Sequence, residues 1–162
     1  MERVGQLELS VSATTRAPRA GERDGVDYHF LSREEFDRRV QAGEFVEHAD
    51  YAGRSYGTLR SELEDRVNAG IPVVLEIEVQ GARQVRAAMP EAVQVFIAPP
   101  SLSALRTRLI GRGTDDPEEV ERRLLVAEHE LHAQPEFAHV VVNDRLDEAL
   151  ERLVEIVSSN LD

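Results

Sequence analysis

The chain has 162 residues, 41% of them hydrophobic, with no cysteine and a formal net charge of −12. This length is typical of one domain, and the composition excludes a wholly disordered chain, a disulfide-stapled fold and a membrane span of ~18 apolar residues. The negative charge disfavours broad nucleic-acid binding, which needs a basic surface, and a chain without cysteine is compatible with the cytoplasm. All 19 basic residues are arginines, so local arginines must hold any anionic ligand.

The predicted elements of the N-terminal part are short. Alternating apolar residues predict a strand over 7–11, and the turn-forming residues of 13–27 predict a polar loop. A capping box of Ser32 and Glu35 predicts the start of a helix that Gly43 ends. Two short strands around a turn at Gly53 and a helix stopped by Gly70 are predicted next, over residues 44–49, 54–56 and 58–68.

In the rest of the chain, β-branched runs alternate with helical stretches. The predicted strands are 73–79, 93–98 and 140–142, and the predicted helices are 82–88, 102–110, 118–133 and 146–158. Such alternation predicts an α/β fold with a mostly parallel sheet flanked by helices. The more polar segment 16–70 is predicted to be a lobe inserted between the first two strands of that sheet.

The densest group of candidate functional residues follows the first predicted strand, over residues 12–22. Parallel strands bind ligands at their carboxyl ends, and here Arg16 and Arg19 flank Pro18, which stiffens the turn. Their forked N–H donors could converge on one phosphate group. Taken alone, the segment is better explained as a solvated polar loop.

Two further groups carry chemistry that suits a nucleotide. Tyr28, Glu47, Tyr56 and Thr58 combine hydroxyl donors for phosphate with a carboxylate that can accept from adjacent N–H groups of a base. Arginines and glycines between residues 106 and 123 suggest a cationic closing loop. The alternatives are half-buried structural residues and an exposed helix with i,i+4 ion pairs. The five histidines form no convincing metal set.

Together these segments resemble guanylate kinase from about Leu9 to Val157. The motifs that carry the resemblance are SVSATTRAPRAGE (10–22), GVDYHF (25–30), FVEHADYAGRSYGT (45–58), VVLEIEVQGA (73–82), FIAPPSLSAL (96–105), RLIGRGT (108–114) and VVVND (140–144). Seven motifs in the expected order disfavour chance. The resemblance implies a single domain over 1–162 with a P-loop-kinase-like core (1–15 and 71–162), a GMP-binding lobe (16–70) and a short lid (about 111–123).

The resemblance also implies a role for each matching residue. GMP and ATP are the implied substrates and Mg²⁺ the implied cofactor, with no nucleic acid or membrane as partner. The residues that match the GMP phosphate site are Arg16, Arg19, Tyr28 and Tyr56; those that match the guanine site are Ser12, Glu47 and Thr58, and Glu22 and Glu76 line the same pocket. Arg108, Arg112 and Arg123 match catalytic arginines beside Arg16, and Arg108, Arg112 and Asn143 match the ATP site.

The sequence departs from the family pattern in three places. Glu78 stands where aspartate is common, and His48 where an aromatic residue is common. The family's glycine-rich loop, G-x-x-x-x-G-K-[ST], which cradles phosphates, does not occur in these 162 residues. We therefore expect an N-terminally shortened guanylate kinase. The alternative is a catalytically inactive relative that binds GMP or a protein.

Overall fold

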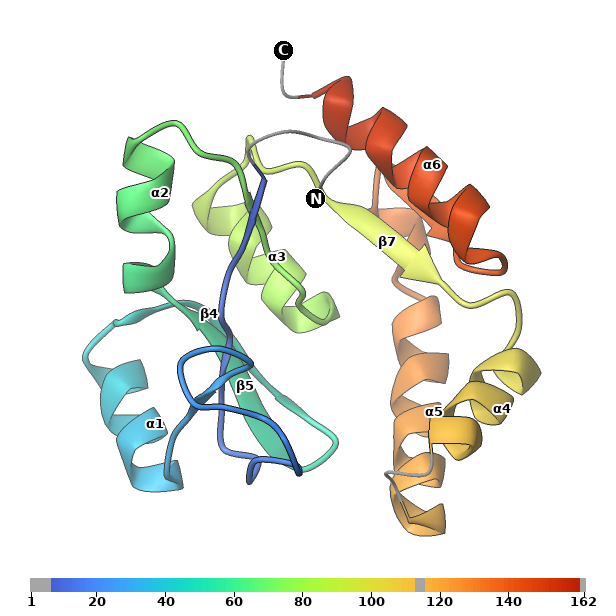
Figure 1. Cartoon of the computed structure of the whole chain (residues 1–162), viewed down its shortest axis with the longest axis horizontal. Helices are drawn as coiled ribbons and strands as arrows, with labels where there is room; N and C mark the ends of the chain where they lie inside the picture. Colours follow the sequence, from blue (N-terminus) through green and yellow to red (C-terminus); the bar gives the residue numbers. More distant parts are fainter. Residues whose placement is uncertain (1–6, 113–115, 161–162) are drawn as a thin grey trace. The chain divides into compact units, whose positions relative to one another are not determined.

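The structure is a computed structural model that describes residues 7–112 and 116–160, and residues 1–92 and 93–162 form two compact units. The first unit contains strands β1 to β6 and helices α1 to α3, and the second contains strands β7 and β8 and helices α4 to α6 (Figure 1). No helix in the described part of the chain is both long and apolar enough to cross a membrane.

The first unit contains a four-stranded sheet in the order β3-β2-β5-β4. Its strands are β2 (Ala13–Thr14), β3 (His29–Phe30), β4 (Phe45–Tyr51) and β5 (Arg54–Leu59). Strands β4 and β5 form a hairpin, whose turn residues Ala52 and Gly53 both have positive φ values, 49° and 77°. This conformation matches the right-handed twist of the strands. The predicted strand pair with its turn at Gly53 is therefore confirmed.

Helix α1 (Arg33–Gln41) packs against this sheet through an aromatic core. The ring centroids of Phe36 and Phe45 lie 4.6 Å apart, and Ala13 and Leu59 complete the cluster. The helix begins where Ser32 Oγ accepts a hydrogen bond from the Glu35 amide at 3.1 Å. The Glu35 carboxylate accepts hydrogen bonds from Arg38 and Arg39, so half of the predicted capping box forms and the glutamate pairs along the helix instead.

Parallel pairing occurs in both units, as the α/β prediction requires. In the first unit β1 (Glu8–Leu9) pairs with β6 (Val73–Val74), and in the second β7 (Val95–Ala98) pairs with β8 (His139–Val142). The helices that follow or connect these strands are α3 (Val79–Ala88), α4 (Leu102–Arg112), α5 (Pro117–Leu131) and α6 (Leu146–Ser158). Helix α6 packs on β8 through the buried residues Val141, Ala149 and Ile156.

Several predicted boundaries are wrong. Thr58 and Leu59 belong to β5, because they pair with β4, so the predicted helix over 58–68 is a turn of 3-10 helix (Arg60–Glu62) followed by α2 (Glu64–Asn68). The strand predicted over 73–79 pairs only at Val73 and Val74, and Val79 already starts α3. The predicted division into core, lobe and lid stays a prediction, and residues 113–115 of that lid lie outside the described residues.

Candidate functional site

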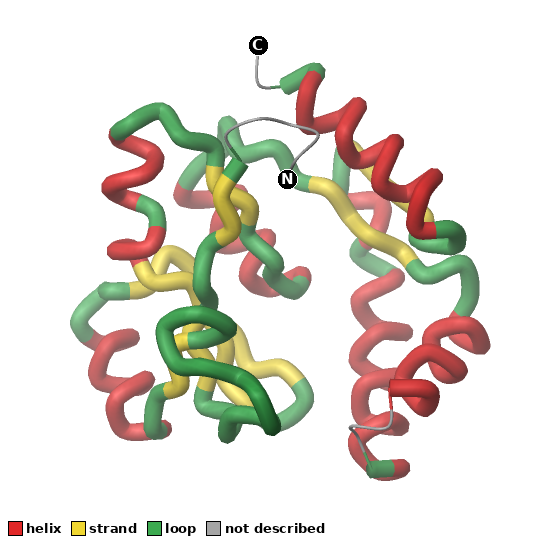
Figure 2. The backbone as a smooth tube through the Cα atoms, in the orientation of Figure 1, coloured by secondary structure: helices red, strands yellow, loops and turns green. Residues whose placement is uncertain are grey.

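The loop between β2 and β3, residues 15–28, is anchored to β5 at its start (Figure 2). Thr14 Oγ1 donates a hydrogen bond to the Ser55 carbonyl and accepts one from the Arg16 amide, both at 3.1 Å. The Ser55 amide donates to Thr15 Oγ1 at 2.9 Å. Because Ser55 is only 2% exposed, these bonds fix where Arg16 leaves the sheet.

Arg16 and Glu22 close the loop with a two-pronged ion pair. The two terminal nitrogens of Arg16 donate to the two carboxylate oxygens of Glu22 at 2.9 and 2.8 Å, and the Arg19 amide donates to the same carboxylate at 2.6 Å. The Arg16 side chain and the Arg19 amide lower the pKa of Glu22 to about 2. Glu22 is therefore an anion that holds the arginine in a defined position.

Aromatic rings surround the Arg16 guanidinium. Its central carbon lies 5.2 Å from the Tyr28 ring centroid and 5.8 Å from that of Phe30, within cation–π range. The Tyr28 and Tyr56 ring centroids are 6.3 Å apart. Three of the four residues predicted for phosphate thus lie together, and the fourth, Arg19, joins them through its amide. A guanidinium beside phenols suits a phosphate monoester.

Two of the three residues predicted for the base, Glu47 and Thr58, are buried and paired. They lie opposite one another on β4 and β5, with exposures of 3% and 0%. The Thr58 hydroxyl donates to Glu47 Oε1 at 2.7 Å. Burial raises the pKa of Glu47, against the lowering effect of the Thr58 hydrogen bond and with a further raising effect from the Glu78 charge. Such a carboxylate gains from a ligand that offers two N–H groups.

The N-terminus of α3 lies beside Glu47. Glu78 caps this helix, and its carboxylate accepts from the amides of Gln80 at 2.8 Å and Gly81 at 2.5 Å. A side chain built on Gly81 would meet both the Glu47 and the Glu78 carboxylates. The other two predicted residues of this group are less enclosed: Glu76 is exposed between β6 and α3, and Ser12, half-buried, accepts the His29 amide through its carbonyl.

In the second unit, two of the residues predicted for ATP lie together. Arg108 donates to the backbone carbonyl oxygens of Asn143 at 2.6 Å and Asp144 at 3.0 Å. Arg123 pairs with Glu119 one helical turn earlier, at 3.2 Å, as the i,i+4 pattern predicts. Arg112 ends α4, and its side chain lies outside the described residues.

Sequence reasoning missed Gly81, Ser55 and Phe30 as residues that shape this site. Gly81 directly precedes the helix predicted over 82–88, so the local pattern contained no clear signal for it; the structure places it inside α3, where a glycine costs helix stability and usually has a packing reason. Ser55 and Phe30 gave no signal either, since their contacts to the arginine loop come from strand pairing far along the sequence.

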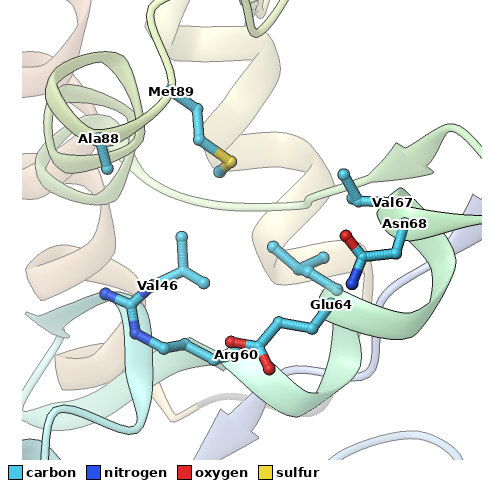
Figure 3. A pocket seen from close by; sticks show the side chains of 8 residues that line it. Val46, Arg60, Glu64, Val67, Asn68, Ala88 and Met89 are labelled. Carbon is cyan, nitrogen blue, oxygen red and sulfur yellow. The ribbon is translucent and has the colours of Figure 1, made fainter. Parts of the chain in front are cut away.

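A separate hollow in the first unit has a volume of about 190 Å³ and lies among β4, α2 and the end of α3 (Figure 3). Val46, Val67 and Met89 give it apolar walls, and Arg60 and Glu64 add charged groups. None of the predicted site residues lines it. The hollow is smaller than most ligand pockets, which measure roughly 300–1,000 Å³, and we assign it no part in nucleotide binding.

Comparison with known proteins gives consistent results. Residues 2–160 match the family model for guanylate kinase. A curated guanylate kinase from Frankia casuarinae is 56% identical over 156 residues, which cover 96% of this chain and 85% of that protein. One from Synechococcus sp. (strain CC9311) is 55% identical, covering 94% and 80%. The crystal structure of guanylate kinase from Anaplasma phagocytophilum matches with a TM-score of 0.84 and 37% identity, covering 99% of this chain and 79% of that chain, in agreement with the predicted fold.

Proposed function

This chain belongs to the guanylate kinase family, and we propose that it transfers the γ-phosphoryl group of ATP to GMP, giving ADP and GDP. The observation that carries the proposal is the buried Glu47–Thr58 pair on the hairpin that also bears Tyr56. Tyr56 and Thr58 are two residues apart on β5 and so share a face of the sheet. A base and its phosphate can therefore be held side by side.

Glu47 explains why the base would be guanine. Guanine presents an N1–H and an amino group on adjacent atoms, and one carboxylate can accept from both. Adenine lacks this pair of donors, so AMP would leave the buried carboxylate of Glu47 with Thr58 as a donor but without its two ligand donors, at a cost of about 1–3 kcal/mol or more. We assign Ser12 and Thr58 to the same base, and Glu76 to the wall of the pocket.

The phosphate of GMP is assigned to the arginine loop. Arg16, Arg19, Tyr28 and Tyr56 would supply the donors, and Glu22 holds Arg16 in place before the ligand binds. Charge-assisted bonds from a guanidinium to phosphate are among the stronger hydrogen bonds in proteins.

The donor side of the reaction is assigned to Arg108, Arg112, Arg123 and Asn143. Phosphoryl transfer is accelerated mainly by positioned cations that stabilise the charge on the transferring group. The glycine-rich loop of the resemblance is not part of these 162 residues, so our assignment on this side rests on the arginines and Asn143.

Mg²⁺ is assigned to the triphosphate of ATP. Among residues 7–112 and 116–160, no group of three His, Asp or Glu side chains could hold a metal ion. Mg²⁺ commonly binds through substrate phosphates with few protein ligands, so the phosphates of ATP would supply most of its ligands here. The metal would neutralise charge on the transferring phosphates.

The comparisons favour an enzyme over a catalytically inactive binding module, because the similar curated proteins are named guanylate kinases. The test is ADP release from Mg²⁺-ATP with GMP, AMP, CMP or UMP as acceptor. We expect GMP to be the preferred acceptor. ADP release that does not depend on GMP, or a preference for another nucleotide as acceptor, would refute the proposal.

A further inference from the structure

Gly81 is the third residue of α3 and is buried against the Glu47 carboxylate. A Cβ atom at this position would overlap Glu47 Oε2 and would lie 3.1 Å from both Glu47 Cδ and Glu78 Oε1. The only atom that this backbone can present to the carboxylate without a clash is therefore hydrogen.

Backbone conformation does not account for this glycine. The glycines with positive φ in the described chain are Gly21, Gly25, Gly43, Gly53 and Gly70, and Gly81 is not one of them. In a helix, glycine is about 1 kcal/mol less favourable than alanine. Glycine at this position therefore costs helix stability and provides space.

The space lies beside one specific oxygen atom. Thr58 fixes Glu47 Oε1 through its hydroxyl, whereas Oε2 lies over Gly81. A larger residue would push Oε2 aside while Oε1 remained tied to Thr58, so the plane of the carboxylate would rotate. Hydrogen bonds weaken steeply as their angles depart from linear, and two parallel bonds to one base need both oxygens in place.

We propose that Gly81 is a positioning residue: it leaves the room in which the Glu47 carboxylate takes the orientation that accepts two adjacent N–H groups of a purine. This inference rests on the proposed function and deepens it. Gly81 acts through Glu47 and makes no contribution of its own to the phosphate end of the ligand.

The test compares GMP with AMP by titration calorimetry on the full chain and on Gly81→Ala. AMP shares the phosphate and ribose but lacks the two adjacent donors. We expect Gly81→Ala to weaken GMP binding about tenfold, the effect of one misplaced hydrogen bond to a charged group, and to change AMP binding less than about twofold. Equal weakening of both nucleotides, or no change in either, would overturn the inference.

Gln80→Ala is the matched control. Gln80 is exposed on the same helical turn, and its contact to the Glu78 cap is made by the backbone amide, which the substitution retains. We expect this variant to bind GMP and AMP as the parent does. A loss of GMP binding equal to that of Gly81→Ala would mean that the whole turn, rather than the space at Gly81, is responsible, and would refute the inference.

A second variant separates crowding from unfolding. Glu47→Asp withdraws the carboxylate by one methylene, so adding Gly81→Ala to it should weaken GMP binding less than about twofold further. If Gly81→Ala alone does not fold, the double variant should, because the overlap is relieved. A double variant that also fails to fold, or full additivity of the two losses, contradicts the inference. A parent chain that binds GMP and AMP equally would instead refute the proposed function.

Discussion

At the scale of single residues, Glu47 combines near-complete burial with a neutral hydrogen-bond partner, Thr58. Burial raises its pKa above the ordinary value of 4.5. Below that pH the residue is protonated in both the folded and the unfolded chain, and its burial as a charged group does not lower the free energy of unfolding. As the pH rises through the folded-state pKa the residue must ionise in its buried position, so the free energy of unfolding falls.

Replacing Glu47 by glutamine should remove this pH-dependent cost. Glutamine keeps an oxygen for the Thr58 hydroxyl and carries no charge, so we expect Glu47→Gln at pH 7 to be at least as stable as the parent. Urea unfolding from pH 4 to pH 8 measures this, with the parent losing stability relative to the variant as the pH rises. GMP binding should weaken in the same variant. A destabilised variant with the parent's pH profile would contradict the account.

Thr58→Val should destabilise the chain. The hydroxyl is fully buried and donates to a carboxylate at 2.7 Å, so its removal leaves a buried acceptor unsatisfied at a cost of about 1–3 kcal/mol. Thr107→Val is the control, because its hydroxyl bonds the Ser103 carbonyl on an exposed face of α4. Urea unfolding of both variants gives the comparison. Equal losses would show that the Thr58 hydroxyl has no special role.

The Arg16–Glu22 pair should survive strong acid. Because the pKa of Glu22 is lowered to about 2, the contribution of this pair to stability is complete above the ordinary value of 4.5 and is lost as the pH falls through about 2. The carboxyl carbon shift of Glu22, followed by NMR, should titrate near pH 2 in the parent and at a higher pH in Arg16→Gln. A parent midpoint near 4.5 would refute the pairing in solution.

At the scale of elements, the hairpin β4–β5 and helix α1 pack together through a cluster that contains the aromatic pair Phe36 and Phe45. Phe36 is 2% exposed and its ring meets that of Phe45. Phe36→Ala should cost about 3–5 kcal/mol, the usual loss for a buried phenylalanine. Thermal unfolding measures the loss, with Val26→Ala as the control because Val26 is 53% exposed. If both variants melt alike, α1 does not stabilise the sheet.

Helix α1 could be predicted from the sequence, whereas the end of β5 and the short strands β2 and β3 could not, for physical reasons. Local signals located α1, since Ser32 and Gly43 act within one turn of the helix ends. The same kind of reasoning extended a helix over Thr58 and Leu59, where pairing with β4 overrides local preference. Strands of two residues, such as β2 and β3, are too short to show any periodicity.

At the scale of the whole molecule, the charges explain how an acidic chain can bind an anion. The net charge is −12, so a phosphate gains nothing from the overall field and depends on Arg16 and its neighbours. The residues proposed for GMP fall within 12–76, and those proposed for the donor within 108–143. This order along the chain is what the sequence motifs predict.

The part of the site that could be predicted is the part that depends on residue types and sequence motifs. The types of the residues in the arginine loop indicated phosphate chemistry, and the resemblance supplied the roles of Glu47 and Thr58. The ion pair of Arg16 with Glu22 depends on how one loop folds back on itself, and the cation–π contact with Phe30 and the room at Gly81 depend on contacts between separate segments. No local pattern encodes such contacts.

The most direct test of the central claim, that the buried Glu47 carboxylate selects guanine, is the ratio of the AMP and GMP dissociation constants measured by calorimetry on the 162-residue chain. Thr58 donates to Glu47 in both complexes, but only GMP adds two N–H donors to the buried carboxylate, so we predict that GMP binds at least about tenfold more tightly than AMP. Equal dissociation constants for the two nucleotides would contradict the claim.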